Sequence, residues 1–376
     1  MTAERKLTVV QLLPALEGGG VERGTLEVAQ ELVKRGHDSW VISGGGQLVS
    51  RLTGQGSRHL QWPIGEKSLW TLRWVRRLRA FLEEQQVDIL HARSRMPAWV
   101  AWRAWNGMPE DCRPRLVTTV HGLYSVNRYS EVMTRGEKII AVSDTARRYI
   151  LDNYPQVDPA RIELIHRGVD PTVFPHGYRP ADSWSQRWFD QYPFLLERFV
   201  LTLPGRLTRL KGHLDFVQLM ERLLADDMPV HGLIVGGEDP RRKRYAQQVR
   251  EEIARRGLQE RITFTGHRMD VRDIYAASNV VLSLSRKPES FGRTVLEALY
   301  MGVPVLGYDH GGVGEILGEL FPQGRVPLGD IQALTAAVRA IHAQRPEVPP
   351  TRTYELQRML DATVGLYEGL VESEQC

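Results

Sequence analysis

The sequence predicts an α/β protein built from two Rossmann-like domains, each with a parallel sheet. From Leu7 onward, short apolar stretches alternate with longer amphipathic ones, a pattern typical of βαβ units. The alternation runs in two series, separated by residues 170–197. The length of 376 residues points the same way, because a single core rarely organises more than about 300 residues.

Each series supplies five expected strands, and each strand is followed by a turn and a helical stretch. The expected strands are residues 7–13, 39–43, 87–91, 116–120 and 138–142 in the first series, and 199–203, 231–235, 261–264, 280–284 and 303–307 in the second. Residues 21–35 have helical spacing and end at Gly36. Residues 170–197 contain prolines and little periodicity, which predicts a linker with one short helix.

The C-terminal end predicts a helix that returns to the first domain. Residues 346–350 are rich in proline and break a preceding helix. One stripe of the next helix carries apolar side chains, namely Leu356, Met359, Leu360, Val364, Tyr367 and Leu370. We therefore expect one domain of residues 1–180, with residues 351–370 packed back on it, and a second domain of residues 181–345.

Composition excludes several classes of protein. Hydrophobic residues make up 42% and charged residues 25%, as in soluble globular proteins rather than disordered or fibrous chains. Cys112 and Cys376 are the two cysteines, so we expect no disulfide framework, no cysteine zinc site and a reducing cytosol. The apolar stretch near the N-terminus is too short for a signal sequence, and no apolar run reaches the roughly 18 residues of a membrane span.

The first half of the chain is basic. Residues 1–180 hold 25 Lys+Arg and 19 Asp+Glu. This excess predicts an anionic partner, either a phosphate-bearing substrate or a membrane surface, although a solvated basic face explains it as well. In the amphipathic stretch 69–82, Trp70, Trp74 and Arg77 fall on one side and suit a lipid headgroup interface. The alternative is a helix packed on the first sheet with its arginines exposed.

The most specific motif is Glu289-Ser290-Phe291-Gly292-Arg293 followed by Glu297, at a strand end and a helix start. A glycosidase pair is excluded, because the helical rise separates the two carboxylates by roughly 12 Å, and a hydrolase pair needs about 5 to 9.5 Å. The spacing suits two contacts at opposite ends of an extended ligand. Between them, the N–H groups of Phe291, Gly292 and Arg293 suit a phosphate.

This segment resembles the E-x7-E signature of family 4 retaining glycosyltransferases, which have the two-domain GT-B fold. The stretch Gly205-Arg206-Leu207 with Lys211-Gly212 is similar to that family's phosphate clamp, and Val120-His121-Gly122 to its acceptor-side histidine. The triglycine at 18–20 is similar to its flexible loop, and residues 167–170 to its pre-linker loop. The resemblance covers residues 7 to 370. It departs at His166-Arg167, where the family often has asparagine before Gly-Val-Asp.

The resemblance implies a role for each matching residue. Glu289 would bond hydroxyls of the donor sugar, Glu297 the ribose, and Arg206 and Lys211 the diphosphate. His121 would lie beside the transferred sugar. The remaining contacts would surround the nucleotide and its phosphates, and they are Gly19, Gly20, Gly236, Gly237, Gly266, His267, Arg268, Phe291, Gly292 and Arg293. Considered singly, each of these charged residues is also consistent with a solvated surface position.

The resemblance implies a retaining hexosyltransferase that uses a nucleoside-diphosphate sugar, with UDP as the expected nucleotide, and needs no metal or other cofactor. The expected acceptor is a bacterial surface glycan or glycolipid such as lipopolysaccharide core, with peripheral association at the inner face of the cytoplasmic membrane and no nucleic acid partner. Arg93 and Arg95 are expected to meet acceptor phosphates or carboxylates.

The alternatives to a transferase are a GT-B sugar-nucleotide epimerase and a non-catalytic sugar-nucleotide-binding subunit. An NAD fingerprint is disfavoured, since Arg23 occupies the place of its third glycine.

Overall fold

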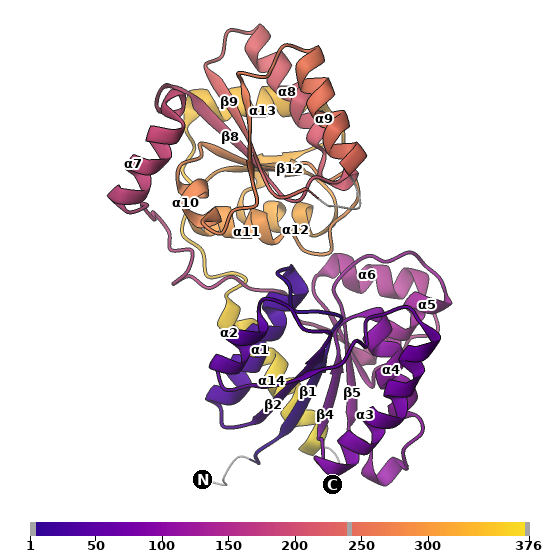
Figure 1. Cartoon of the computed structure of the whole chain (residues 1–376). Coiled ribbons are helices and arrows are strands. Elements are labelled where there is room, and N and C mark those ends of the chain that lie inside the picture. The colour runs from indigo at the N-terminus through magenta and orange to yellow at the C-terminus, as the bar shows by residue number, and fades with distance from the viewer. Residues whose placement is uncertain (1–4, 239–242, 373–376) are drawn as a thin grey trace. The chain divides into compact units, whose positions relative to one another are not determined.

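The computed structural model describes residues 5–238 and 243–372, so Cys376 lies outside the described residues. The chain forms two compact units (Figure 1). One holds the residues up to Gly168 together with those from Leu356 onward, and the other runs from Val169 to Glu355. Residues 169–180 and 346–355 thus group with the second unit, although we expected the boundaries at 180 and 345. The assignment of an acceptor-side and a donor-side domain stays a prediction.

The first unit is a seven-stranded parallel sheet in the order β3-β2-β1-β4-β5-β6-β7, with helices on its faces. Its strands are β1 (Thr8–Leu12), β2 (Asp38–Ser43), β3 (Arg58–Gln61), β4 (Ile89–Ala92), β5 (Arg115–Val120), β6 (Lys138–Ala141) and β7 (Ile162–Leu164). Its helices are α1 (Gly20–Lys34), α2 (Val49–Gly54), α3 (Arg73–Glu84), α4 (Arg95–Trp105), α5 (Arg128–Glu131), α6 (Asp144–Asn153) and α14 (Leu356–Glu372).

The second unit is a six-stranded parallel sheet in the order β10-β9-β8-β11-β12-β13. Its strands are β8 (Phe199–Pro204), β9 (Val230–Val235), β10 (Ile262–Gly266), β11 (Val280–Ser283), β12 (Val305–Tyr308) and β13 (Arg325–Val326). Its helices are α7 (Asp182–Gln191), α8 (His213–Ala225), α9 (Lys243–Arg255), α10 (Val271–Ala276), α11 (Arg293–Tyr300), α12 (Gly311–Leu320) and α13 (Ile331–Gln344). Both sheets confirm the predicted pair of Rossmann-like domains.

Each sheet has a switch point, where the strand order reverses direction. In the first sheet β1 lies beside β4, with Gln11 opposite His91. In the second sheet β8 lies beside β11. Open α/β sheets bind ligands just beyond the carboxyl ends of their strands at such a point. The fold therefore offers one candidate binding position in each unit.

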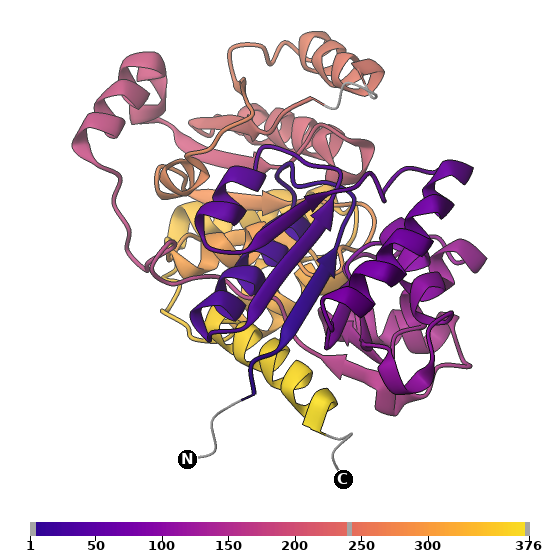
Figure 2. The ribbon, with the colours of Figure 1, turned by 60° about the horizontal axis from the view of Figure 1, so that its bottom comes forward.

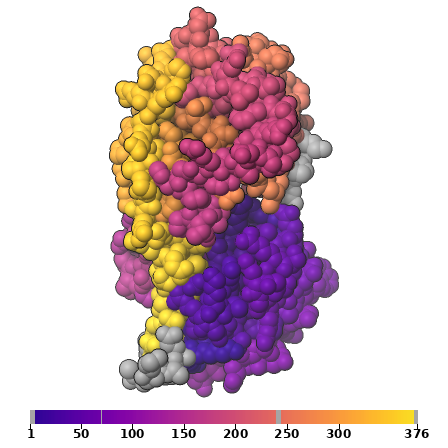
Figure 3. Space-filling view, turned by 90° about the vertical axis from the view of Figure 1, so that its left-hand side faces the viewer, coloured from indigo at the N-terminus to yellow at the C-terminus, as the bar shows by residue number. Residues whose placement is uncertain are grey.

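The last helix returns to the first unit, as predicted. Figure 2 shows α14 alongside α1, and Figure 3 shows it at the surface beside the N-terminal elements. Its buried side chains join one core cluster with strands β1, β4, β5 and β6, and these side chains are Met359, Leu360, Val364, Tyr367 and Val371. Burying each large apolar side chain contributes about 1.5–3 kcal/mol, which holds the helix on this unit.

The expected linker is largely part of the second unit. Helix α7 begins at Asp182, and its Trp188 is buried against Val200, Leu233 and Ile274 of that unit. The sequence has little apolar periodicity here, between prolines, so it predicted a short helix but not that this helix is packed in the second unit.

Three strands were not predicted. They are β3, β7 and β13, which contain four, three and two residues and lie at or near the sheet edges. Edge strands are partly solvated, so they do not need the continuous apolar runs that mark buried parallel strands. The expected central strands are confirmed.

Of the three residues on the predicted lipid-facing side, Trp70 and Arg77 are exposed, but Trp74 is buried. The stretch 69–82 divides into a 3-10 turn, Leu69–Leu72, and helix α3, whose buried residues are Trp74, Leu78 and Leu82. Trp74 stacks on Trp62, with ring centroids 5.2 Å apart, so it belongs to the core. Arg73, Arg76 and Arg77 are exposed.

Across the described residues, the helices are all too short or too polar to cross a membrane.

Candidate functional site

Two charged residues meet at the switch point of the second sheet. Lys211 closes the short turn after β8, and Glu289 lies in the loop after β11. The Nζ of Lys211 donates to Oε1 of Glu289 over 2.7 Å. Because the neighbouring strands are parallel, their carboxyl ends lie together, and this explains how residues so distant in sequence form one pair.

The surroundings of Glu289 keep its carboxylate ionised. The Ser285 hydroxyl donates a second hydrogen bond to Oε1. Burial raises the pKa of Glu289, but the charge and hydrogen bond of Lys211, with the bond from Ser285, outweigh it, so the pKa is lowered from its ordinary value. The site therefore holds a fixed, partly exposed anion beside a cation.

Glycines let the backbones approach closely around this pair. A Cβ at Gly236 would lie 2.0 Å from the Gly205 carbonyl oxygen, and one at Gly212 would lie 2.0 Å from that of Leu284. Gly212 has φ of 71°, which favours glycine, and it caps the N-terminus of α8. A side chain at either position would push apart the strand ends that hold Lys211.

The helix of the E-x7-E segment starts later than expected. Gly292, with φ of 113°, is the N-cap of α11, and the helix begins at Arg293. The Phe291 N–H therefore precedes the first turn, and the Phe291 side chain is buried beside Tyr354. The N–H groups of Arg293 and Thr294, rather than that of Phe291, are the first of the helix. The expected phosphate contact at the Phe291 N–H stays a prediction.

Glu297 is buried rather than on the surface. Its side chain is 5% exposed, and Oε1 accepts from Nε of Arg293 over 3.0 Å, one helical turn earlier. The structure thus brings Arg293 and Glu297 together on one face of α11. A buried, hydrogen-bonded carboxylate is held in one position, as a fixed ligand contact requires.

The other expected contacts lie at the ends of neighbouring strands. Gly236 and Gly237 follow β9, and His267 and Arg268 follow β10. A Cβ at Gly237 would lie 3.5 Å from Cβ of His267, so these two strand ends adjoin. Arg268 is engaged elsewhere, because Nε donates to Asp270 over 2.8 Å. Arg206 is exposed beyond β8.

Sequence reasoning missed a buried network that supports the loop of Glu289. The fully buried carboxylate of Asp215 accepts from the Tyr308 hydroxyl over 2.6 Å and from both Nε and Nη2 of Arg286. The Arg286 N–H also donates to the carbonyl of Leu210, which ties the β11 loop to the turn carrying Lys211. An aspartate in the first turn of a helix gives no sequence signal of burial.

In the first unit, His121 and the triglycine loop are joined through Arg167. Gly19 caps α1, and the carbonyl of Gly20 accepts from Nη2 of Arg167. Nη1 of Arg167 lies 3.4 Å from Nδ1 of His121, just beyond β5. Burial, and then the positive charge of Arg167, lower the pKa of His121 well below 6.5, so the ring is neutral.

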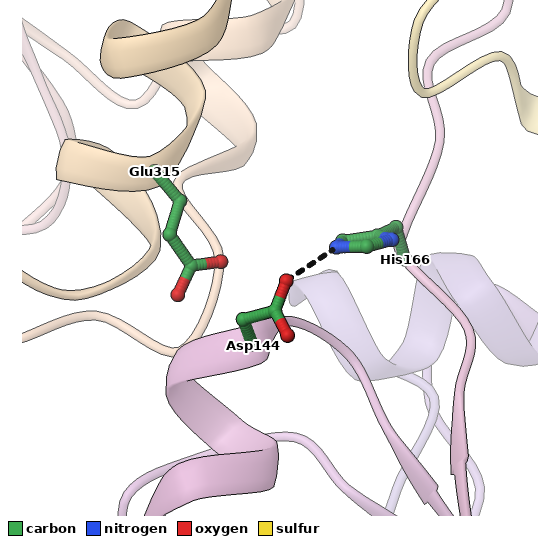
Figure 4. A group of neighbouring side chains, drawn as sticks. All are labelled: Asp144, His166 and Glu315. Carbon is green, nitrogen blue, oxygen red and sulfur yellow. Dashed lines mark ion pairs between the residues drawn. The ribbon is translucent and has the colours of Figure 1, made fainter.

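The residue before Arg167 faces a different partner. Figure 4 shows His166 beside Asp144, with Nε2 3.8 Å from Oδ2, at the N-terminus of α6. His166 and Arg167 therefore point to different groups. Only Arg167 lies with His121.

Arg93 and Arg95, expected together at an acceptor, separate in the structure. Arg93 is 4% exposed, and its Nη1 donates to Oε1 of Gln11 over 2.6 Å. Arg95 lies over the Tyr124 ring, 4.7 Å from its centroid. Arg93 directly follows β4, whereas Arg95 is the first residue of α4, so the two side chains reach different groups.

Two family models match the chain. The model of Glycosyltransferase Family 4 matches residues 18–173, and that of Glycosyl transferases group 1 matches residues 185–354. The chain is a family 4 glycosyltransferase. Its two sheets and returning helix are those of the GT-B fold, as in the crystal structure of a glycosyltransferase from Rickettsia africae ESF-5, with 28% identity, a TM-score of 0.86 and coverage of 98% of this chain and 99% of that chain.

Other relatives are more distant or shorter in overlap. A 2-deoxystreptamine N-acetyl-D-glucosaminyltransferase from Streptomyces fradiae is 37% identical over 35% of this chain and 31% of its own length. A lipopolysaccharide core biosynthesis mannosyltransferase from Rhizobium meliloti is 27% identical over 64% and 68%. An Anabaena protein solved in complex with UDP and glucose has a TM-score of 0.79 at 19% identity, with 98% and 99% covered, and shares the fold.

This glycosyltransferase aligns with only part of the length of its relatives. The alignment with the Streptomyces protein spans about a third of that protein's length. The alignment with a further relative spans 79% of that relative's length. The two family models establish the family, whereas the donor and acceptor must be inferred from the residues at the two switch points.

Proposed function

We propose that the chain is a retaining glycosyltransferase that moves a hexose from a UDP-sugar to a bacterial surface glycan such as lipopolysaccharide core. The observation that carries the proposal is the Lys211–Glu289 pair at the switch point of the second sheet. A cation beside a fixed carboxylate suits a donor whose diphosphate and sugar hydroxyls lie side by side.

Each residue has a task in this proposal. Arg206 and Lys211 neutralise the diphosphate and stabilise it as it leaves, and the N–H groups at the start of α11 add to that charge. Glu289 accepts hydrogen bonds from the sugar, and Glu297 from the ribose. Gly236, His267 and Arg268 border the base.

The first unit would supply the acceptor side. His121 lies beside the transferred sugar, and Gly19 and Gly20 approach the diphosphate through their backbones. A neutral His121 can donate or accept one hydrogen bond without adding charge to a site that already holds Arg167. Attack from the face of the leaving diphosphate, with a phosphate oxygen taking the acceptor proton, retains configuration without a protein nucleophile. No metal takes part in this scheme.

Support for the donor and acceptor comes from similar proteins. The UDP and glucose bound by the Anabaena protein favour a UDP-hexose, and the Rhizobium mannosyltransferase favours a lipopolysaccharide core acceptor. The exposed arginines of α3 suit peripheral contact with an anionic membrane that carries such an acceptor.

Donor turnover separates this proposal from its alternatives. The protein is incubated with a panel of UDP-hexoses, with and without core oligosaccharide, and UDP release and the sugar products are followed by NMR. A transferase releases UDP with acceptor and gives a product that keeps the donor's anomeric configuration. Conversion of the sugar without acceptor would mean an epimerase. Binding without any conversion would mean a non-catalytic subunit.

A further inference from the structure

The carboxylate of Glu289 receives both of its side-chain hydrogen bonds on one oxygen. Oε1 accepts from Nζ of Lys211 over 2.7 Å and from the hydroxyl of Ser285. Within residues 5–238 and 243–372, no hydrogen bond reaches Oε2. The side chain of Glu289 is 26% exposed, so Oε2 is the oxygen that remains for a ligand.

Ser285 is held in turn by His310. Nε2 of His310 lies 2.7 Å from the carbonyl oxygen of Ser285. Since a carbonyl oxygen can only accept, Nε2 carries the proton and donates it. Ser285 follows β11 and is 4% exposed, and His310 is the N-cap of α12. The bond therefore joins two neighbouring turns, and its loss would leave a buried main-chain carbonyl with one donor fewer.

The turn that carries His310 also packs on the main chain of Glu289. The Gly312 N–H donates to the Glu289 carbonyl over 2.8 Å. A Cβ at Gly311 would lie 2.7 Å from the same carbonyl oxygen, and one at Gly312 would lie 2.2 Å from the carbonyl oxygen of Phe291. Gly311 has φ of 60°, which favours glycine. Because β11 and β12 are parallel neighbours, the two turns lie side by side.

We propose that His310 and Ser285 are positioning residues that orient Glu289, so that its Oε2 meets the donor sugar. His310 holds the main chain at Ser285, and the Ser285 hydroxyl then holds Oε1. Lys211 alone is a poor anchor, because its side chain is flexible and the proposed function also needs it at the diphosphate. A carboxylate fixed in advance loses less freedom when the sugar binds. The inference rests on the proposed function, because it deepens the role given to Glu289.

Binding of UDP and of a UDP-hexose separates the orientation of Glu289 from support of the whole donor site. The probes are UDP and whichever of UDP-glucose, UDP-galactose and UDP-N-acetylglucosamine the wild type binds most tightly, and calorimetric titration measures Kd. His310→Leu removes the hydrogen-bond donor, and Ser285→Ala removes the hydroxyl. Each should raise Kd for the UDP-hexose about tenfold and leave Kd for UDP within about twofold, because UDP lacks the sugar.

Three further variants locate the effect. His310→Gln keeps an N–H donor on the side chain and should restore the wild-type Kd for the UDP-hexose. His342→Leu removes another partly buried histidine of the same unit, on α13, and should change neither Kd. In a chain that carries Glu289→Ala, adding His310→Leu should weaken the UDP-hexose no further, because residues that act through one group are not additive.

The proposal is overturned if either His310→Leu or Ser285→Ala binds the UDP-hexose as tightly as the wild type, or if either weakens UDP to the same extent. It is also overturned if His310→Gln behaves like His310→Leu, or if the losses from His310→Leu and Glu289→Ala add.

Glu289→Ala by itself separates this inference from the proposed function. If Glu289→Ala leaves UDP-hexose binding unchanged, the assignment of the donor site is wrong. If Glu289→Ala weakens that binding and His310→Leu does not, the donor site stands and only the positioning role is wrong.

Discussion

The Nζ of Lys211 lies 2.7 Å from Oε1 of Glu289, although 78 residues separate them in the sequence. The parallel pairing of β8 with β11 brings their two loops together at the switch point. The ion pair between Asp215 and Arg286 anchors the loop that carries Glu289. This relationship is the basis of the predictions on the donor site.

Replacing the two glutamates should have different kinetic consequences. Glu289→Gln removes an anion that the proposed function sets against the sugar, so kcat should fall about 100-fold, which is about 2.7 kcal/mol of transition-state stabilisation. Glu297→Gln weakens a buried contact to the ribose, and KM for the donor should rise about tenfold with a smaller change in kcat. Steady-state kinetics on the UDP-sugar measure both. If both variants keep wild-type kinetics, the assignment of Glu289 and Glu297 as donor contacts is wrong.

The pH dependence should report on His121. Burial and the charge of Arg167 lower its pKa well below 6.5, so the neutral ring persists as pH falls past that value. Arg167→Asn removes the charge and should raise the pKa of His121. The acid limb of kcat/KM then moves toward neutral pH, because activity is lost as the ring gains its proton at higher pH.

An NMR titration of the His121 ring checks the same shift without turnover. Arg113→Gln serves as the control, since it removes a guanidinium that lies over Trp105. If Arg167→Asn leaves both the ring titration and the acid limb where they were, the coupling between these residues does not govern the protonation of His121.

Transfer should persist in saturating EDTA. In the proposed site, Arg206, Lys211 and the start of α11 supply the positive potential that other transferases obtain from a divalent cation. The rate of UDP release is compared with and without chelator. Loss of activity in EDTA and its recovery with magnesium or manganese would contradict the metal-free scheme.

The exposed arginines of α3 predict salt-sensitive membrane binding. Each basic residue near an anionic surface contributes roughly 1 kcal/mol, which salt screens. Charge reversal at Arg73, Arg76 and Arg77 should therefore reduce sedimentation with anionic liposomes at low salt. The same reversal at Arg222, Arg255 and Arg339 of the second unit is the control. Equal sedimentation of the two variants would mean that α3 packs on the first sheet without contributing to membrane binding.

The sequence predicted the central strands and the last helix because buried parallel strands and amphipathic helices leave continuous patterns. It did not reveal β3, β7 or β13, whose edge positions need few apolar residues, nor the packing of α7, whose apolar pattern is short. The resemblance to family 4 motifs singled out Glu289 and Lys211, and the structure brings these two residues together, while their roles at the donor stay a prediction. The sequence could not predict that Trp74 is buried or that Asp215 is buried beside Arg286, since both depend on partners far along the chain.

Calorimetric titration with UDP tests the central claim most directly, because it needs no acceptor. The wild type should bind UDP, Lys211→Gln should weaken the binding about tenfold or more, and Arg222→Gln, an exposed arginine on α8, should leave it unchanged. Equal UDP affinity in the wild type and Lys211→Gln, or no binding by the wild type, would contradict a donor site at the Lys211–Glu289 pair.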